Sequence, residues 1–180
     1  MQVERRRFLQ QAALGAAGCS LASASGLAAS TPTHVVASTR SGRIGGVREQ
    51  GVQVFRGIRY GADTAPRRFQ HALQAATWRG VRDALGYAAS APQNGDEGPG
   101  SEDCLFLNVW TPGLRDGARR PILFYIHGGG YNNGSGSSPL YDGGNLCRRG
   151  DVVVVTVNHR LNAFGYLFLA ELGGPEMAWS

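Results

Sequence analysis

The fold of this chain is decided by the stretch Pro121-Ile-Leu-Phe-Tyr-Ile-His-Gly-Gly-Gly-Tyr131. It opens with a continuous apolar run, and Val152 to Val157 forms a second such run. Runs of this kind are typical of strands covered on both faces. Between them lie the glycine-rich loop and a predicted short helix from Gly144 to Arg149, which ends at Gly150. We therefore predict a right-handed crossover between two parallel strands, which is the α/β class.

The residues before this unit predict antiparallel strands. Apolar and small polar residues alternate from Thr33 to Phe55, with a turn signal at Glu49-Gln-Gly51, so we expect two or three short strands there. A further strand is predicted from Leu105 to Thr111. Residues 61 to 93 read as irregular, and residues 94 to 100 as a polar surface loop.

Composition places the chain among globular proteins. Of its 180 residues, 42% are hydrophobic, 17% are charged and three are cysteine, which excludes a disordered acidic tail and a disulfide-stapled miniprotein. All 18 basic residues are arginine, and they are scattered along the sequence. Without the first thirty residues the net charge of +5 falls to +3. No basic stripe follows a phosphate backbone, so we expect no nucleic-acid partner.

The N-terminus resembles an export signal. Arg5-Arg-Arg-Phe-Leu-Gln10 matches the twin-arginine motif, and a mildly apolar stretch and small residues follow it. We predict a signal peptide over residues 1–30, cleaved near Ala24 to Ala29, and a periplasmic or secreted protein. The stretch from Arg7 to Arg40 has too little apolar character for a stable membrane span. A disordered tail and a lipoprotein acylated at Cys19 are the alternatives.

The glycine loop after the first apolar run is the candidate site. Ligands of α/β sheets bind at the carboxyl ends of strands, which is where His127-Gly-Gly-Gly-Tyr131 lies. Consecutive glycines can aim successive N–H groups at one oxyanion, and a loop of the HGGG type does so in lipases and esterases. Neither nucleotide-binding glycine pattern fits, because the spacing is wrong and the chain has no lysine. Taken alone, the loop is also compatible with a flexible turn, and His127 with a packing role.

A longer match adds to this interpretation. Ser101-Glu-Asp-Cys-Leu-Phe-Leu-Asn-Val-Trp-Thr-Pro112 resembles the signature of the type-B carboxylesterase (cholinesterase-like) family. Further matches follow the order of that family along the chain, from Thr33 to about Gly174. They are Phe55-Arg-Gly-Ile-Arg-Tyr60, Arg68-Phe69, Trp78-x-Gly80, Pro92-Gln93, the loop at 127–131, Gly134-Ser-Gly-Ser137, Val155-Thr-Val-Asn-His-Arg-Leu161 and Phe164-Gly165.

The resemblance implies the N-terminal portion, residues 31–180, of an α/β-hydrolase catalytic domain. In that domain antiparallel front strands lead into a mostly parallel central sheet. It also implies hydrolysis of a small-molecule carboxylic ester through a serine acyl-enzyme. The N–H groups of Gly129 and Gly130 would form part of the oxyanion hole, and His127 and Gly128 would support the loop. Such esterases need no cofactor, and no His pair or Cys-x-x-Cys at metal-ligand spacing occurs.

The resemblance also implies structural roles for several polar residues. Arg68 and Glu102 match positions that form an ion pair in the family. Asn158-His-Arg160 matches a polar corner at a strand end. We expect both groups to support the fold rather than to take part in catalysis.

The chain departs from the family at three points. Arg59 replaces a proline, and Ala91 replaces a cysteine that often lies before Pro-Gln, so the first disulfide of the family is in doubt and a Cys104–Cys147 pair stays open. No G-x-S-x-G occurs, so these 180 residues supply no nucleophilic serine, triad acid or triad histidine.

Three expectations follow from the missing triad and from the further strands and helices that the expected sheet has beyond this portion. The 180-residue polypeptide alone should be inactive and marginally stable. The Val152–Val157 strand should lie at or near an uncovered edge, with its apolar faces incompletely packed. A truncated inactive product and a non-catalytic binding fragment are the alternatives to an esterase.

Overall fold

The computed structural model describes residues 33–95 and 100–174. The predictions of a signal peptide, its cleavage and lipid attachment at Cys19 fall on the first thirty residues, which lie outside this range. None of the helices in the described part has the length and apolar character that a membrane span requires.

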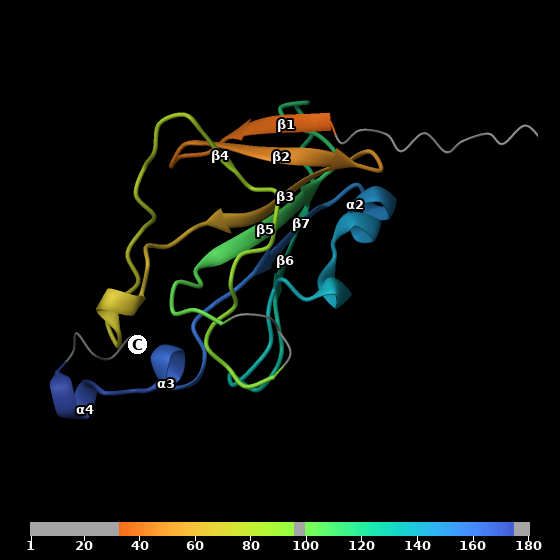
Figure 1. Cartoon of the computed structure of the whole chain (residues 1–180). Coiled ribbons are helices and arrows are strands. Elements are labelled where there is room, and N and C mark those ends of the chain that lie inside the picture. Colours follow the sequence, from red (N-terminus) through yellow and green to blue (C-terminus); the bar gives the residue numbers. More distant parts are fainter. Residues whose placement is uncertain (1–32, 96–99, 175–180) are drawn as a thin grey trace, which may run out of the picture. The chain divides into compact units, whose positions relative to one another are not determined.

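The described residues form a mixed α/β structure around one sheet (Figure 1). Along the sheet the strands follow the order β1-β2-β3-β5-β7-β6, and β4 pairs with β2 beside this path. The β6–β7 and β2–β4 pairs are parallel, and the other pairs are antiparallel. The strands are β1 (Thr33–Ser38), β2 (Arg43–Glu49), β3 (Val52–Arg59), β4 (Val81–Asp83), β5 (Phe106–Thr111), β6 (Ile122–Ile126) and β7 (Val153–Val157).

The antiparallel front strands are confirmed, and the predicted turn joins β2 to β3. Gln50 and Gly51 both have positive φ angles, 48° and 84°, and Glu49 pairs with Val52 across the turn. A two-residue loop with two positive φ angles matches the right-handed twist of the strands that it joins. The glycine at its second position makes this hairpin readable from the sequence.

The predicted parallel pair is also confirmed. β6 pairs with β7 in parallel from Ile122 opposite Val153 to Ile126 opposite Val157. The helix between them is α2 (Gly144–Gly150), which ends where Asp151 adopts a left-handed conformation with φ of 47°. α2 packs against β3, β5 and β7 and so covers one face of the sheet (Figure 1). The remaining helical segments are η1 (Ala65–Arg67), η2 (Pro139–Tyr141), α3 (Asn162–Tyr166) and α4 (Ala170–Gly173).

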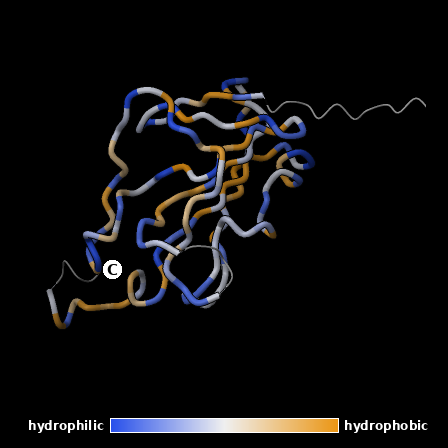
Figure 2. Tube along the Cα trace, in the orientation of Figure 1, coloured by the Kyte–Doolittle hydropathy of each residue, from blue (hydrophilic) through white to orange (hydrophobic). Residues whose placement is uncertain are grey.

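The core lies between α2 and the middle of the sheet, where the tube in Figure 2 runs through hydrophobic residues. Trp110 is 1% exposed and packs with Val52, Val54, Val154 and Cys147. Separate buried clusters surround Phe55 and Leu161. Because β3, β5 and β7 supply most of the core, these strands hold the neighbouring loops in place.

Of two expectations about the apolar strands, one is confirmed and one is wrong. As expected for Val152–Val157, β7 lies near the edge of the described sheet, between β5 and the edge strand β6, and it is only partly buried. The edge strand is β6, which was expected to be covered on both faces. Its side chains are largely exposed, with Ile122 at 66% and Phe124 at 55%. An apolar run therefore predicts a strand whose side chains are suited to burial. Whether those side chains are buried depends on the strands and helices that pack against them.

The segment predicted as irregular contains two short elements. η1 and β4 both fall within residues 61 to 93. β4 consists only of Val81-Arg-Asp83, all three exposed, and it is held by main-chain pairing with β2. A three-residue strand without an apolar pattern gives no periodic signal, which explains why the sequence did not reveal it.

Neither described cysteine forms a disulfide. Cys104 and Cys147 are both free and fully buried, in two separate core clusters. Ala91, which stands where the family often has a cysteine, packs in the same cluster as Cys104. Burial raises the pKa of the Cys104 thiol to about 11. Both residues therefore act as small hydrophobic core residues.

Candidate functional site

The glycine loop directly follows β6, at the carboxyl end of that strand. Gly129 and Gly130 have φ angles of 124° and 60°, in a region that residues with a Cβ rarely adopt. A Cβ on Gly129 would collide with the carbonyl oxygen of Asn133, whereas a Cβ on Gly128 or Gly130 would meet only open space. The loop thus needs glycine at position 129 for a close approach of the backbone, and at position 130 for its conformation.

The backbone of the loop is held by hydrogen bonds to one of its carbonyl oxygens. The N–H groups of Asn132 and Asn133 both donate to the carbonyl oxygen of Gly129, at 3.1 and 3.3 Å. Among the described residues, the N–H groups of Gly129 and Gly130 have no hydrogen-bond acceptor. They lie beside an open depression of about 350 Å³. Its lining comes from the loop, from β6 and from the segment after β7, and consists of Ile126–Tyr131, Asn133, His159, Leu161 and Tyr166.

His127 lies beneath the loop and is only 7% exposed. Its Nδ1 is 2.9 Å from the carbonyl oxygen of Gly128. The imidazole ring stacks on that of His159, with ring centroids 4.5 Å apart and planes 10° from parallel. Gly134 closes in from the other side, where a Cβ would collide with the carbonyl oxygen of Gly128. His127 is therefore a buried side chain that packs against the loop and supports it.

Two tyrosines continue this cluster of rings. Tyr131, at the end of the loop, lies against Tyr166 with ring centroids 4.5 Å apart. The Tyr166 hydroxyl oxygen is 3.1 Å from Nδ1 of His159. Burial raises the pKa of Tyr166, as does its proximity to Tyr131, so this hydroxyl stays protonated at neutral pH. The contact of these four rings could not be predicted from the sequence, because His127 and His159 are 32 positions apart.

The segment after the loop is anchored by Asn158, which is 2% exposed. Its side-chain oxygen accepts hydrogen bonds from the N–H of Gly136 at 2.7 Å and from the hydroxyl of Ser135 at 3.1 Å. Its side-chain nitrogen donates to the carbonyl oxygen of Ala89 at 3.1 Å. Gln93 adds a second anchor, since its side chain both accepts from and donates to the backbone of Gly134.

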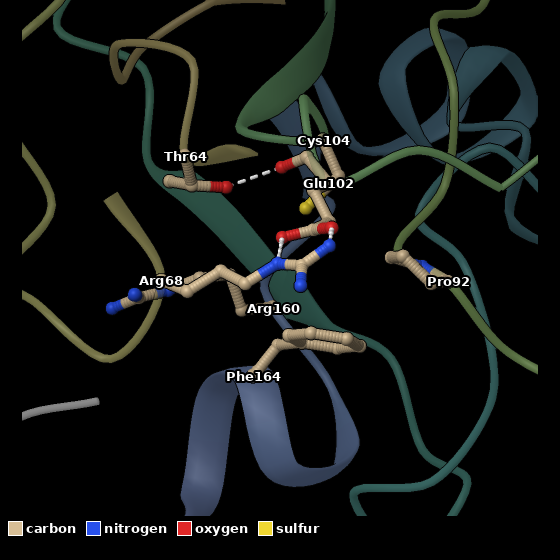
Figure 3. Close-up of a pocket in the computed structure, with 7 residues that line it drawn as sticks. All are labelled: Thr64, Arg68, Pro92, Glu102, Cys104, Arg160 and Phe164. Carbon is tan, nitrogen blue, oxygen red and sulfur yellow. Dashed lines mark hydrogen bonds and ion pairs between the residues drawn. The ribbon is translucent and has the colours of Figure 1, made fainter. Parts of the chain in front are cut away.

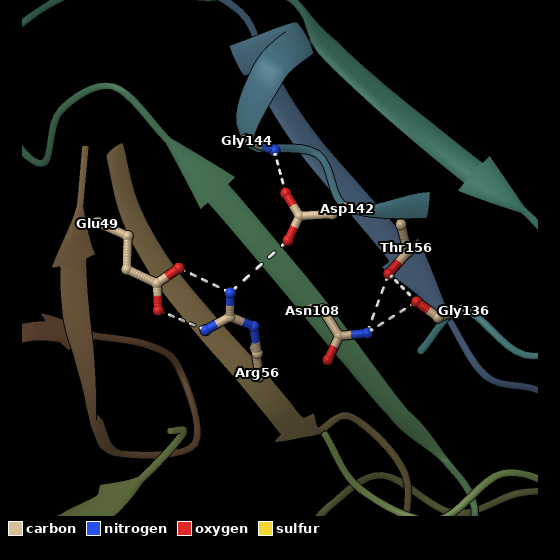
Figure 4. A network of polar contacts seen from close by, with 7 residues as sticks. All are labelled: Glu49, Arg56, Asn108, Gly136, Asp142, Gly144 and Thr156. Atoms are coloured by element: carbon tan, nitrogen blue, oxygen red, sulfur yellow. Dashed lines mark hydrogen bonds and ion pairs between the residues drawn. The ribbon is translucent and has the colours of Figure 1, made fainter. Parts of the chain in front are cut away.

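Asn108 on β5 holds the same segment from the side (Figure 4). Its Nδ2 donates to the carbonyl oxygen of Gly136 at 3.1 Å and to the hydroxyl of Thr156 at 3.0 Å. The Thr156 hydroxyl in turn donates to Gly136 at 2.6 Å. Buried amides that use both ends in this way fix one backbone arrangement, because any other would leave polar groups without partners.

A neighbouring ion pair ties β2 to β3 in the same figure. The Arg56 guanidinium binds Glu49 through two hydrogen bonds, at 2.7 and 2.8 Å, and lies 3.7 Å from Asp142 (Figure 4). Hydrogen bonding by Arg56 lowers the pKa of Glu49, and burial partly opposes this shift. Asp142 also accepts the N–H of Gly144 at the start of α2, so the pair connects the hairpin to the helix.

The predicted Arg68–Glu102 ion pair is confirmed (Figure 3). Arg68 binds both carboxylate oxygens of Glu102, with Nε to Oε2 at 2.7 Å, and these hydrogen bonds hold the pKa of Glu102 below its ordinary value. The guanidinium lies 5.3 Å from the ring centre of Phe164. Thr64 donates to the backbone carbonyl of Glu102. This arrangement joins the η1 region to the segment before β5 and lies apart from the glycine loop.

Arg59, which replaces a proline of the family, forms an ion pair with Asp103. Its guanidinium binds Asp103 through two hydrogen bonds of 2.6 Å and lies 4.5 Å from the ring centre of Phe106. This pair fastens β3 to the start of β5. It was not foreseen, because nothing in the spacing of Arg59 and Asp103 indicates that they meet.

The described part of the chain contains no candidate metal site. Within residues 33–95 and 100–174, no group of three His, Cys, Asp or Glu side chains is placed to hold a metal ion. The polar features that gather at the loop are the two N–H groups of Gly129 and Gly130, two stacked imidazoles and two tyrosine hydroxyls. Adjacent N–H groups that point at one position can bind the oxygen of a carbonyl as it gains negative charge.

Comparison with known proteins identifies close relatives. Residues 33–175 match the model of the family described as Carboxylesterase family. Phenmedipham hydrolase of Pseudarthrobacter oxydans is 43% identical over 82% of this chain and 31% of its own length. Para-nitrobenzyl esterase of Bacillus subtilis (strain 168) is 39% identical over 77% of this chain and 30% of its own.

A solved structure agrees with these sequence matches. The carboxylesterase EST55 of Geobacillus stearothermophilus, determined at pH 6.2, superimposes with a TM-score of 0.74 at 45% identity, over 79% of this chain and 30% of that protein. The chain thus spans about a third of the length of the relatives it matches. Its sheet corresponds to the N-terminal part of carboxylesterase α/β-hydrolase structures, as the sequence predicted. Given a family match over residues 33–175, the chain belongs to the carboxylesterase family.

Proposed function

We propose that this chain forms the oxyanion-binding portion of a serine carboxylesterase. In this proposal Gly129 and Gly130 donate their N–H groups to the carbonyl oxygen of a small-molecule ester as a serine attacks its carbon. His127 and Gly128 keep the loop in shape. A serine nucleophile with its base and acid completes the reaction, and the 180 residues contain no G-x-S-x-G that would supply this serine.

One observation carries the proposal. The N–H groups of Gly129 and Gly130 have no acceptor among the described residues, and they lie beside an open depression. Both glycines are exposed, and Asn132 and Asn133 hold the loop, so these two adjacent N–H groups are available to a ligand oxygen in the depression. In water-excluded sites, one such donor contributes roughly 3–4 kcal/mol to transition-state stabilisation.

The lining of the depression favours an ester with an aromatic group. Tyr131 and Tyr166 present exposed rings there, beside Leu161. Aromatic walls bind flat apolar groups by stacking. Para-nitrobenzyl esterase, one of the two relatives compared above, is named for an ester that carries such a group.

We further propose that the protein is exported through its twin-arginine motif. The support is the run Arg5-Arg-Arg-Phe-Leu9 followed by small and apolar residues. Fractionation of cells should place the wild-type chain outside the cytoplasm, while the Arg5→Lys/Arg6→Lys variant stays inside. Equal distribution of the two forms would contradict export by this route.

A transplant tests the esterase proposal. Residues 33–175 would replace the matching segment of para-nitrobenzyl esterase of Bacillus subtilis, which supplies the rest of the catalytic domain. We expect the chimera to hydrolyse a p-nitrophenyl ester. Its Gly130→Ala variant puts a methyl group into the open space beside the two N–H groups, and should lose about 100-fold or more in kcat, as when an oxyanion donor is lost.

Gly86→Ala is the matched control. Its Cβ also meets open space, but Gly86 lies outside the loop and has no positive φ angle, so activity should be kept. A folded, active chimera in which Gly130→Ala behaves like this control would refute the role of the loop. The 180-residue polypeptide by itself should show no turnover, which separates it from a self-sufficient esterase. A catalytically silent chimera that is folded would instead favour a binding fragment or an inactive product.

A further inference from the structure

We propose that His159 and Tyr166 form a clamp that sets the position of the glycine loop. The inference rests on the proposed function and adds two positioning residues to it. Neither side chain is assigned to the reacting atoms. Their effect is transmitted through the two residues that bracket the three glycines, His127 and Tyr131.

The contacts of the clamp reach both ends of the loop. His159 stacks on His127, with ring centroids 4.5 Å apart, and Tyr166 lies against Tyr131 at the same distance. His159 and Tyr166 meet edge to face, with centroids 5.8 Å apart. The two ends of the loop are thus joined through a pair of side chains that touch each other. A change in that pair must alter the separation of the ends, and with it the direction of the glycine N–H groups.

A hydrogen bond fixes the pair. Nδ1 of His159 is 3.0 Å from the carbonyl oxygen of Arg160 and 3.1 Å from the Tyr166 hydroxyl. Because a carbonyl oxygen can only accept, we assign the imidazole proton to Nδ1, which donates toward both oxygens. Nε2 of His159 is buried and has no hydrogen-bond partner among the described residues. The hydrogen bonds of this imidazole are therefore all made by Nδ1, which supports the ring orientation described.

The backbone carries the same connection. The N–H of Asn162, between the two clamp residues, donates to the carbonyl oxygen of Tyr131 at 2.9 Å. The side chain of Asn162 donates to the carbonyl oxygen of Asn132 at 3.0 Å. The segment from the end of β7 through α3 therefore contacts the loop both through aromatic rings and through hydrogen bonds to its main chain. Local packing of this kind keeps reacting groups oriented, and small displacements reduce rates strongly.

The first test observes the loop directly and needs no catalysis. The full chain would be labelled with ¹⁵N-glycine, and its amide spectrum compared among the wild type, Tyr166→Phe and Tyr141→Phe. Tyr141 is the matched control, because it also belongs to a tyrosine pair, with Tyr125, whose ring centroid lies 4.6 Å away. We expect Tyr166→Phe to shift and broaden the amide signals of the loop glycines, and Tyr141→Phe to leave them in place.

The second test is a double-variant cycle in the active chimera. His159→Phe keeps a ring for the stack but removes Nδ1, and Tyr166→Phe removes only the hydroxyl. Each should lower kcat about fivefold with KM unchanged, the factor that one neutral hydrogen bond represents. The double variant should also lose about fivefold, because both changes remove the same bond.

The outcomes are distinct. A loss of about 25-fold in the double variant would mean that the two residues act independently, and the clamp would be wrong. Glycine signals that respond equally to Tyr166→Phe and Tyr141→Phe would overturn it as well. If the chimera had no esterase activity while the glycine signals responded as expected, the proposed function would fail and the clamp would stand.

Discussion

Replacing Asn158 by alanine should destabilise the chain more than any exposed polar substitution. The variant leaves the N–H of Gly136 and the hydroxyl of Ser135 without their acceptor, and both residues are buried. It also takes away the donor to the carbonyl oxygen of Ala89. Each buried group left without a partner costs about 1–3 kcal/mol, so the free energy of unfolding should fall by roughly 3 kcal/mol or more.

Urea titration followed by tryptophan fluorescence measures this loss. Trp110 is 1% exposed and packs in the main core, so its emission reports unfolding. Asn145→Ala is the matched control, because Asn145 is exposed on α2. If Asn158→Ala is unfolded without urea, the titration is repeated in an osmolyte that adds stability to every variant. The expected loss is a large part of the 5–15 kcal/mol that holds a typical domain together.

Two results would refute this reasoning. If Asn158→Ala and Asn145→Ala differ by less than about 0.5 kcal/mol, the buried amide does not hold the segment, since changes of that size are ordinary at surfaces. If the loss is large but the ¹⁵N-glycine signals of the loop stay in place, Asn158 supports the core alone. In that case the segment that Asn158 anchors does not hold the glycine loop in place.

Three further predictions follow from the described contacts. Cys104 and Cys147 should resist alkylation in the native chain at pH 8 and react once it is unfolded, as peptide mass spectrometry would show; fast native labelling of Cys104 would contradict its burial and its pKa of about 11. The pKa of Glu49 is lower in the folded chain than its ordinary 4.5, so its pair with Arg56 stabilises the fold above that pH and loses its effect as the pH falls. The Glu49→Gln variant should therefore be less stable than wild type at pH 7, by at most ~1 kcal/mol for this partly exposed pair, and equally stable near pH 3 in urea titrations; a difference that persists in acid would exclude the charge as its cause. The exposed apolar side chains of edge strand β6 favour self-association of the chain, so Phe124→Glu should reduce the self-association measured by light scattering. Unchanged self-association would mean that another surface mediates it.

Local features were readable wherever neighbouring residues decide them. Gln50-Gly51 supplies a turn that joins two alternating stretches, and the observed register begins there. The two apolar runs around α2 predicted the parallel pair that β6 and β7 form. The Arg68–Glu102 pair also followed from the sequence, although through the family resemblance rather than through spacing.

Contacts between distant segments decided the rest. β4 exists because β2 offers it main-chain partners, and the exposure of β6 follows from its place at the edge of the sheet. The three glycines show that a tight loop can form after β6, but the stacking of His127 on His159 depends on how β6 and β7 align. The sequence by itself determined the turn, the glycine loop and the strands other than β4, because their causes lie within a few residues. Only the tertiary structure decided what holds that loop, because packing and hydrogen bonds join residues that the chain keeps far apart.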